Sequence, residues 1–113
     1  MLYISDTKYC PTVFKGINHV LIEANYDQKL LDSNPNYIGA LRDRVMNSHM
    51  RIDTTRDFIE KINNPSLYSV CLIHISSSNS DVERFKEEIE KVTYANVTVA
   101  KAGTVLELGN SMF

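Results

Sequence analysis

The sequence predicts an α/β domain in which short apolar strands are followed by amphipathic helices. Two observations support this prediction. Short apolar or β-branched runs occur near the start, the middle and the end of the chain, as expected of buried strands. Between them, apolar residues recur at helical spacing, next to Asn, Pro, Ser and Asp residues that start or stop helices. The expected element order is ββααβαββ, in a mixed sheet with helices on one face.

The first half of the chain is expected to contain two strands and then two helices. Residues 2–5 and 20–24 are short apolar runs that read as strands. The apolar residues of 36–46 fall at helical spacing, after an Asn-Pro start signal and before an Asn-Ser stop. Asp53 has the position of an N-cap for a second helix over 54–62, which an Asn-Asn-Pro sequence ends.

The second half is expected to contain the central strand, one helix and a closing hairpin. The run 68–75 is too continuously apolar for a solvated edge, so it is predicted to be a strand covered on both faces. A charged amphipathic helix is predicted to follow the Ser80-Asp81 cap and to continue through Val92. Strands over 97–100 and 104–108 are expected to pair around a Lys-Ala-Gly turn.

Composition indicates one domain over residues 1–113 with an ordinary core. The chain is 43% hydrophobic and 23% charged, with a formal net charge of -2. Such a balance gives no general attraction to nucleic acid or to an anionic membrane. Nucleic acid therefore remains a partner only through a local basic patch.

The sequence also favours a cytoplasmic protein that does not enter the membrane. No apolar run approaches the roughly 18 residues that a membrane-spanning helix requires. Cys10 and Cys71 are far apart in apolar contexts, which fits reduced thiols better than a disulfide framework.

Two predicted strands end in residue types that bind metals. Asp6 follows the first strand, and His74 lies near the carboxyl end of the central strand, at edges where α/β proteins assemble their sites. Both residues also have structural interpretations. Asp6 would cap the turn that follows it, and His74 would be an interior histidine bonded to a carbonyl group or to Ser76.

Several other polar residues have the same two interpretations. His49 lies between the two predicted helices, where it would either cap a helix or, beside Ser48, Arg51 and Asp53, contact phosphate. His19 is expected to be a solvated residue at the start of a strand.

Three further groups of polar residues are expected to be structural. Glu23, Asn25 and Asp27, which follow the second strand, are predicted to cap the turn into 28–31. The serines of 76–80 are predicted to cap a helix. The arginines near His49 are predicted to lie on a solvated helix face; they are Arg42, Arg44 and Arg51.

Four segments occur in an order that resembles a known family. They are Tyr3-Ile4-Ser5-Asp6-Thr7, Leu21-Ile22-Glu23-Ala24-Asn25-Tyr26-Asp27, Ser48-His49-Met50 and Leu72-Ile73-His74-Ile75-Ser76. Together they resemble the carboxyl-terminal half of metallo-β-lactamase-fold hydrolases, in the branch of ribonuclease Z and related nuclease-like phosphodiesterases. The resemblance covers most of the chain. It implies half of an αββα sandwich, truncated relative to the family fold.

The resemblance also implies roles for three residues. Asp6 would bridge two divalent metal ions, zinc or manganese, and His74 would bind one of them. His49 would help to stabilise the phosphate leaving group. The His-x-His-x-Asp-His cluster that completes the family's metal centre is missing, since the chain contains only 3 histidines. The chain is therefore not expected to be a hydrolase by itself.

Three functional classes follow from these expectations. In the first, a partner chain that carries the missing amino-terminal half completes a phosphodiesterase, with nucleic acid as the expected substrate. In the second, the chain is a catalytically inactive interaction or inhibitor module of mobile-element or phage type, acting as a homodimer. In the third, Asp6 and His74 of two subunits share one metal ion across a two-fold axis.

Overall fold

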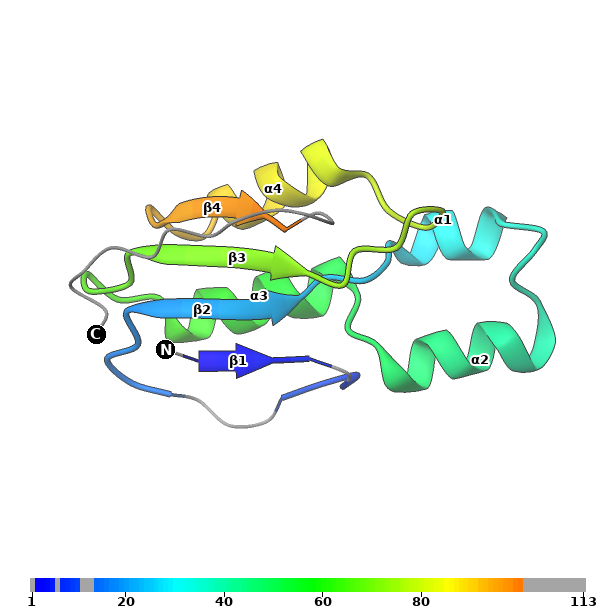
Figure 1. Ribbon diagram of the computed structural model, residues 1–113, viewed down its shortest axis with the longest axis horizontal. Helices are drawn as coiled ribbons and strands as arrows, with labels where there is room; N and C mark the ends of the chain where they lie inside the picture. The colour runs from blue at the N-terminus through cyan, green and yellow to red at the C-terminus, as the bar shows by residue number, and fades with distance from the viewer. Residues whose placement is uncertain (1, 6, 11–13, 101–113) are drawn as a thin grey trace.

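The computed structural model describes residues 2–5, 7–10 and 14–100 of the chain. Within them, four strands and four helices follow the order ββαααβαβ (Figure 1). The strands are β1 (Leu2–Ile4), β2 (His19–Glu23), β3 (Ser69–Ile73) and β4 (Asn96–Val99). The helices are α1 (Gln28–Ser33), α2 (Gly39–Ser48), α3 (Ile52–Ile62) and α4 (Val82–Glu90).

The four strands form one sheet in their sequence order, β1-β2-β3-β4, and every neighbouring pair is parallel. Parallel neighbours require the chain to return to the same end of the sheet between strands. Between β2 and β3 this return is made by α3, which follows α1 and α2, and between β3 and β4 it is made by α4 (Figure 1). The carboxyl ends of all four strands therefore lie at one edge of the sheet (Figure 1).

The parallel sheet shows that the expected mixed sheet of order ββααβαββ, drawn from half of an αββα sandwich, is wrong. The first strand of the predicted closing hairpin is β4, which pairs parallel to β3. The predicted second strand, 104–108, lies outside the described residues. The short helix α1 was also missed, because its six residues carry only one start signal, the cap Asp27. Short apolar runs predict where strands lie, but the direction of each strand in the sheet depends on the segments that connect the strands.

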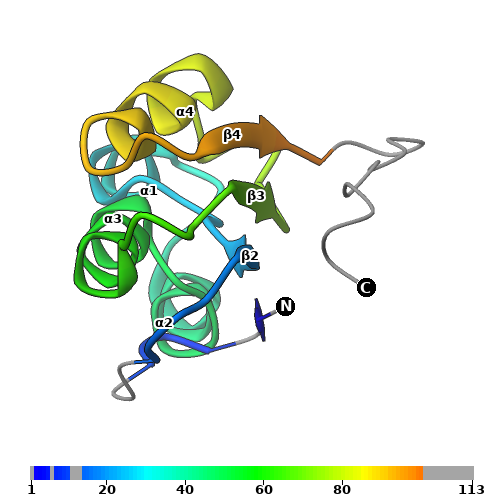
Figure 2. The same cartoon turned by 90° about the vertical axis from the view of Figure 1, so that its left-hand side faces the viewer.

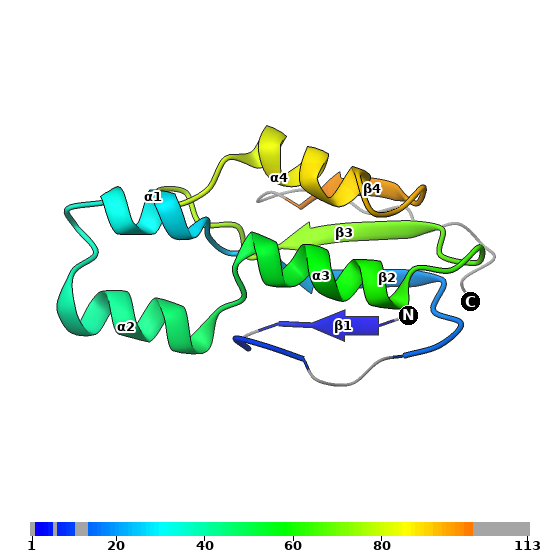
Figure 3. The same cartoon turned by 180° about the vertical axis from the view of Figure 1, so that it is seen from behind.

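Helices α3 and α4 cover one face of the sheet (Figures 2 and 3). Each buries one apolar stripe against the strands, and burying a large aliphatic or aromatic side chain stabilises the fold by about 1.5–3 kcal/mol. The core between these layers includes Phe58, Ile59 and Ile62 of α3, Phe85 and Ile89 of α4, and Val20, Ile22, Val70 and Leu72 of the strands.

The predicted cap of α4 is confirmed, whereas the predicted cap of α3 is wrong. Asp81 caps α4, and its carboxylate accepts a hydrogen bond from the backbone N–H of Arg84 at 3.2 Å. Helix α3 begins at Ile52, two residues before the predicted start, with Arg51 as its N-cap and no capping side chain. Asp53 lies in the first turn of α3 and Lys61 in the last, so both charges complement the helix dipole.

Helices α1 and α2 form an arm, residues 28–48, that extends beyond the carboxyl ends of the strands (Figure 1). Asp32 of α1 forms an ion pair with Arg42 of α2, which joins the two helices. Helix α2 has no buried residue, and the side chain of Ile38 just before it is 72% exposed. Helix α2 therefore contributes little to the core, whereas α1 buries Leu31 completely.

Candidate functional site at the carboxyl edge of the sheet

Polar side chains from three neighbouring strands meet at the carboxyl edge of the sheet. Ser5 directly follows β1, Glu23 is the last residue of β2, and His74 directly follows β3. The segment between α2 and α3 brings His49 to the same place. Ligand sites of parallel α/β sheets usually lie at this edge, because the loops that leave the strands converge there.

Glu23 lies at the centre of the cluster, and its side chain is fully buried. Its Oε1 lies 2.8 Å from Nδ1 of His49, and its Oε2 accepts a hydrogen bond of 2.7 Å from the backbone N–H of Met50. Its own carbonyl group accepts a 2.6 Å hydrogen bond from the Thr55 hydroxyl. A buried carboxylate is costly unless it is fully hydrogen-bonded. The segment 49–50 therefore depends on Glu23 for its position.

The carboxylate of Glu23 sets the orientation of the His49 ring. An ionised carboxylate can only accept, so Nδ1 donates and Nε2 carries the lone pair of the neutral imidazole. The side chain of His49 is 32% exposed, which leaves the ring accessible. An imidazole held by a carboxylate in this way is typical of metal ligands and of general acid–base groups.

His74 contacts the same carboxylate, and its backbone conformation is unusual. Its Nδ1 lies 2.6 Å from the Ser5 hydroxyl and 3.3 Å from Oε1 of Glu23, and its side chain is 44% exposed. Its φ of 51° is the only positive value of a non-glycine residue among those that the structure describes. Backbone strain of this kind is concentrated at functional sites.

Asn25 connects the loops around the two histidines by hydrogen bonds. Its side-chain amide donates a 2.7 Å hydrogen bond to the carbonyl group of His74, which fixes the strained residue. Its backbone N–H donates to the carbonyl group of Met50 at 2.8 Å, and its carbonyl group accepts from Ser76 at 2.9 Å. Asn25 therefore ties the loops that follow β2, α2 and β3 into one unit.

The structure brings together two of the three predicted site residues. His49 and His74 share Glu23, whereas Asp6 lies outside the described residues. His49 is also the C-cap of α2, so its capping interpretation holds alongside its contact with the carboxylate. His74 is exposed and bonds to Ser5 rather than to Ser76, so the interior interpretation was wrong.

Glu23 was missed as a site residue because it was predicted to cap a turn together with Asn25 and Asp27. Of these three residues, Asp27 makes the predicted contact, accepting a hydrogen bond from the backbone N–H of Lys29 at 2.8 Å. The signal that could have found Glu23 is its place directly after the apolar residues Val20, Leu21 and Ile22. A carboxylate that ends a buried strand needs buried partners.

His19 also differs from its prediction. It was expected to be solvated, but it is 5% exposed, and its Nδ1 lies 2.6 Å from the Ser69 hydroxyl. Both residues begin their strands, so this pair lies at the amino edge, at the opposite end of the sheet from Glu23.

The fit of this cluster to a divalent metal ion is partial. Glu23 arranges two imidazoles as it would arrange metal ligands. However, no group of three or more His, Cys, Asp and Glu side chains that could hold a metal ion is found among the residues that the structure describes. Within the described ranges, Glu23, His49 and His74 therefore do not make a metal site by themselves.

A cavity of about 610 Å³ opens beside His74. Ile73, Ile75 and Val99 contribute apolar walls, and the exposed ring of Tyr3 lies at its side. A volume of this size accommodates a small organic group or an inserted side chain. The cluster is thus bordered by an apolar surface on which another molecule can rest.

Comparison with models of known protein families gives no match, and comparison with curated protein sequences gives none either. Across residues 2–5, 7–10 and 14–100, no helix has both the length and the apolar character needed to cross a membrane.

Proposed function

We propose that the chain is one part of a metal-dependent phosphodiesterase and that a second chain completes its site. The observation that carries the proposal is the buried carboxylate of Glu23, which holds His49 and His74 at the carboxyl edge of a parallel sheet. Burial of a charge is costly, and carboxylates orient the imidazoles of metal ligands in this way. The four segments that resemble metallo-β-lactamase-fold hydrolases favour the same chemistry, although the parallel sheet is not the half-sandwich that this resemblance implied.

Each residue has a distinct role in this proposal. His74 and Asp6 would hold zinc or manganese, together with histidines of the completing chain. The ion supplies an activated water when it is bound. When both of its ring nitrogens are protonated, His49 would donate a proton or a hydrogen bond from Nε2 to the phosphate oxygen that leaves. Glu23 is a positioning residue, because it acts through both imidazoles.

A partner is required because the described residues supply too few ligands. The expected partner carries the His-x-His-x-Asp-His cluster that this sequence lacks. Homodimerisation is the second route to a filled site, with Asp6 and His74 contributed twice.

The second candidate function is a catalytically inactive interaction module. It is favoured by the apolar cavity beside His74 and by the exposed Ile38 and Leu41 of the arm. In this case the chain would bind another protein, or a second copy of itself, without any metal ion.

Molar mass and metal content together test the proposal. The chain is purified alone and with the product of the coding sequence directly upstream, and light scattering is recorded with zinc, with manganese and with chelator. We expect a complex that retains metal and hydrolyses bis(p-nitrophenyl) phosphate, and that loses both properties in His74→Gln. A matched control is His19→Gln, which removes an imidazole from the opposite edge of the sheet.

Two results would favour other functions. A dimer of the chain alone that dissociates in chelator would indicate the metal site shared between two copies. A complex or dimer that forms equally well in chelator, contains no metal and hydrolyses nothing would contradict the phosphodiesterase and leave the interaction module.

A further inference from the structure

A second cavity, of about 340 Å³, lies outside the cluster of Glu23, His49 and His74. It is enclosed by the segment after β1, the start of α1, the end of α2 and the start of α3. Lys8 and Arg51 contribute exposed cationic groups to its lining. Neither forms an ion pair with a residue that the structure describes. We call this space the basic cavity.

Tyr26 gives the basic cavity a hydroxyl donor. The residue is 3% exposed and lines the cavity, and its hydroxyl makes no hydrogen bond within the described part of the chain. Burial also raises the pKa of Tyr26 above its ordinary value, against the opposing effect of Arg51, so the O–H proton is retained. The hydroxyl is thus ready to donate to a ligand.

Gln28 adds an acceptor in the same lining. Its amide nitrogen donates to Asp32 at 2.9 Å, whereas its Oε1 is buried and has no hydrogen-bond partner among the described residues. Asn47 contributes a second carboxamide. Carboxamides match the donors and acceptors on the edges of nucleobases.

The amino end of α3 contributes to the same charge pattern. Arg51 precedes the helix, and no side chain caps its first turn, in which Thr54 lines the cavity. Uncapped N–H groups at a helix start favour an anion, in addition to the two side-chain cations. Asp53 is the opposing charge in that turn, and it is exposed.

We propose that the basic cavity binds a nucleotide. Lys8, Arg51 and the hydroxyl of Tyr26 would hold its phosphate group. The base would stack on the ring of Tyr9, which is 54% exposed, with its edge toward Gln28 and Asn47. Cations with an aromatic face and carboxamides suit a nucleotide better than a simple anion. The ligand is either a free mononucleotide or one unit of a single strand, since both present the same chemistry.

This inference does not depend on the proposed hydrolase. Binding in the basic cavity requires neither a metal ion nor a completing chain, because none of its lining residues belongs to the cluster at Glu23. The two ideas can therefore fail separately.

An NMR titration of the purified ¹⁵N-labelled chain, with chelator present throughout, tests the inference. The three probes are inorganic phosphate, adenosine monophosphate and a single-stranded hexathymidylate. We expect both nucleotide probes to shift the amide signals of Asn47, Arg51 and Thr54. Arg51→Gln should weaken binding roughly tenfold or more, as expected for a lost charge-assisted hydrogen bond. Tyr26→Phe should weaken it less, because it removes only a neutral donor.

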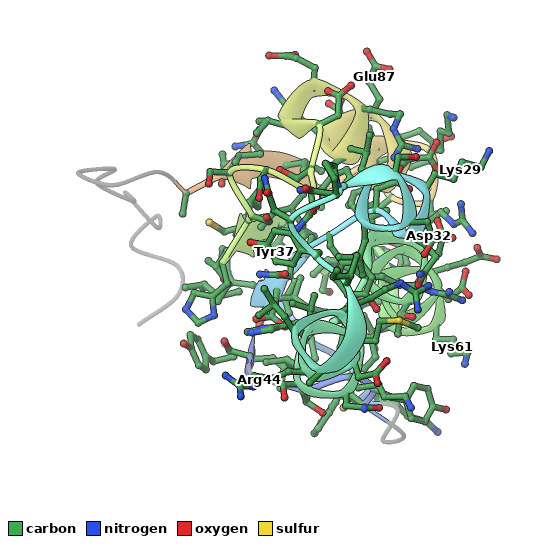
Figure 4. All side chains as sticks on the ribbon, turned by 90° about the vertical axis from the view of Figure 1, so that its right-hand side faces the viewer. Lys29, Asp32, Tyr37, Arg44, Lys61 and Glu87 are labelled. Atoms are coloured by element: carbon green, nitrogen blue, oxygen red, sulfur yellow. The ribbon has the colours of Figure 1, made fainter. Side chains whose placement is uncertain are left out.

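Arg44→Gln is the matched control. It removes an exposed arginine of α2 that does not line the basic cavity, so it should leave the affinity unchanged (Figure 4). Arg51→Lys retains the charge and should recover part of the affinity, which separates binding from any effect on folding. Tighter binding of the hexathymidylate than of the mononucleotide would identify a strand as the source of the ligand, and equal binding would identify a free nucleotide.

Three results would overturn the inference. In the first, the signals around the basic cavity do not move with either nucleotide. In the second, inorganic phosphate binds as tightly as the nucleotides do. In the third, Arg44→Gln weakens binding as much as Arg51→Gln.

Discussion

The two edges of the sheet place histidines in opposite environments. At the amino edge, His19 is 5% exposed and bonds to the neutral hydroxyl of Ser69, and its Nε2 is buried with no hydrogen-bond partner among the described residues. At the carboxyl edge, His49 and His74 reach solvent and share the buried carboxylate of Glu23. The first arrangement suits a core side chain. The second leaves two imidazoles that are oriented by a carboxylate and accessible to another molecule.

The largest effect is expected at the centre of the carboxyl edge. Glu23→Ala should lower the free energy of unfolding by about 3 kcal/mol, because it leaves the buried N–H of Met50 without an acceptor and releases His49. Urea unfolding measures the change. Glu23→Gln keeps an acceptor for Met50 and should cost less than Glu23→Ala. Equal stability of Glu23→Ala and the unmodified chain would show that the carboxylate does not organise this edge.

The second prediction compares the histidines of the two edges directly. His19→Ala should cost about 2 kcal/mol, since it removes a buried ring and its hydrogen bond to Ser69. His49→Ala should cost no more than about 1 kcal/mol, because that ring is partly exposed. Thermal unfolding of the two variants side by side gives the order. The reverse order would mean that the carboxyl edge, not the amino edge, carries the structural histidine.

A gain in stability is expected from the strained residue of the carboxyl edge. His74→Gly should stabilise the fold by roughly 0.5 kcal/mol, because glycine adopts a positive φ without strain while the lost hydrogen bonds are partly exposed. The same variant should lose the metal binding proposed for the completed site. Differential scanning calorimetry measures the stability, and a destabilised variant would show that the contacts of the imidazole outweigh the strain.

An effect of similar size is expected away from both edges, where α3 and α4 meet. Hydrogen bonds from Lys91, which has the larger effect, and from Arg56 hold the pKa of Glu88 below its ordinary value. The side-chain nitrogen of each lies 3.0 Å from a carboxylate oxygen of Glu88. A lowered pKa in the folded state means that Glu88 stabilises the fold above the ordinary carboxyl pKa, and that this contribution is lost as the pH falls toward the lowered value. Because Lys91 is exposed, Glu88→Gln should cost only about 0.5 kcal/mol near neutral pH.

Unfolding at neutral and at acidic pH measures the effect of Glu88→Gln, with Glu60→Gln on the exposed side of α3 as the control. The difference between Glu88→Gln and the unmodified chain should shrink under acidic conditions. A difference that grows as the pH falls would have the wrong sign for this ion-pair network.

The sequence predicted the element types of the fold better than their arrangement. Apolar spacing indicated α3 and α4, because Phe58 and Phe85 each lie on one helix face, and the cap Asp81 marked the start of α4. The start of α3 was predicted two residues late, because Asp53 lies inside its first turn instead of capping it. The direction of β4 could not be read from its residues, since a parallel and an antiparallel strand bury the same side chains. That direction depends on α4, which returns the chain to the amino edge before β4 begins.

The candidate site shows a similar limit. His49 and His74 attract attention as residue types, but their meeting point is Glu23, which is separated from them by 26 and 51 positions in the chain. Only the parallel pairing of β2 with β3 places the ends of these strands together. The pairing of Arg42 with Asp32 was equally hidden, because the bend between α1 and α2 that brings them together has no periodic signal.

The absence of any buried residue in α2 has a consequence for how this protein can change over time. Most mutations are purged because they loosen a core, and stability limits the sequences that a fold can explore. Substitutions on the outer surface of α2 escape that limit. His49 and Asn47 lie at the end of this helix, so variants there can alter which molecules approach the edge while the sheet remains intact. The arm is thus a place where new binding preferences can arise at little risk to folding.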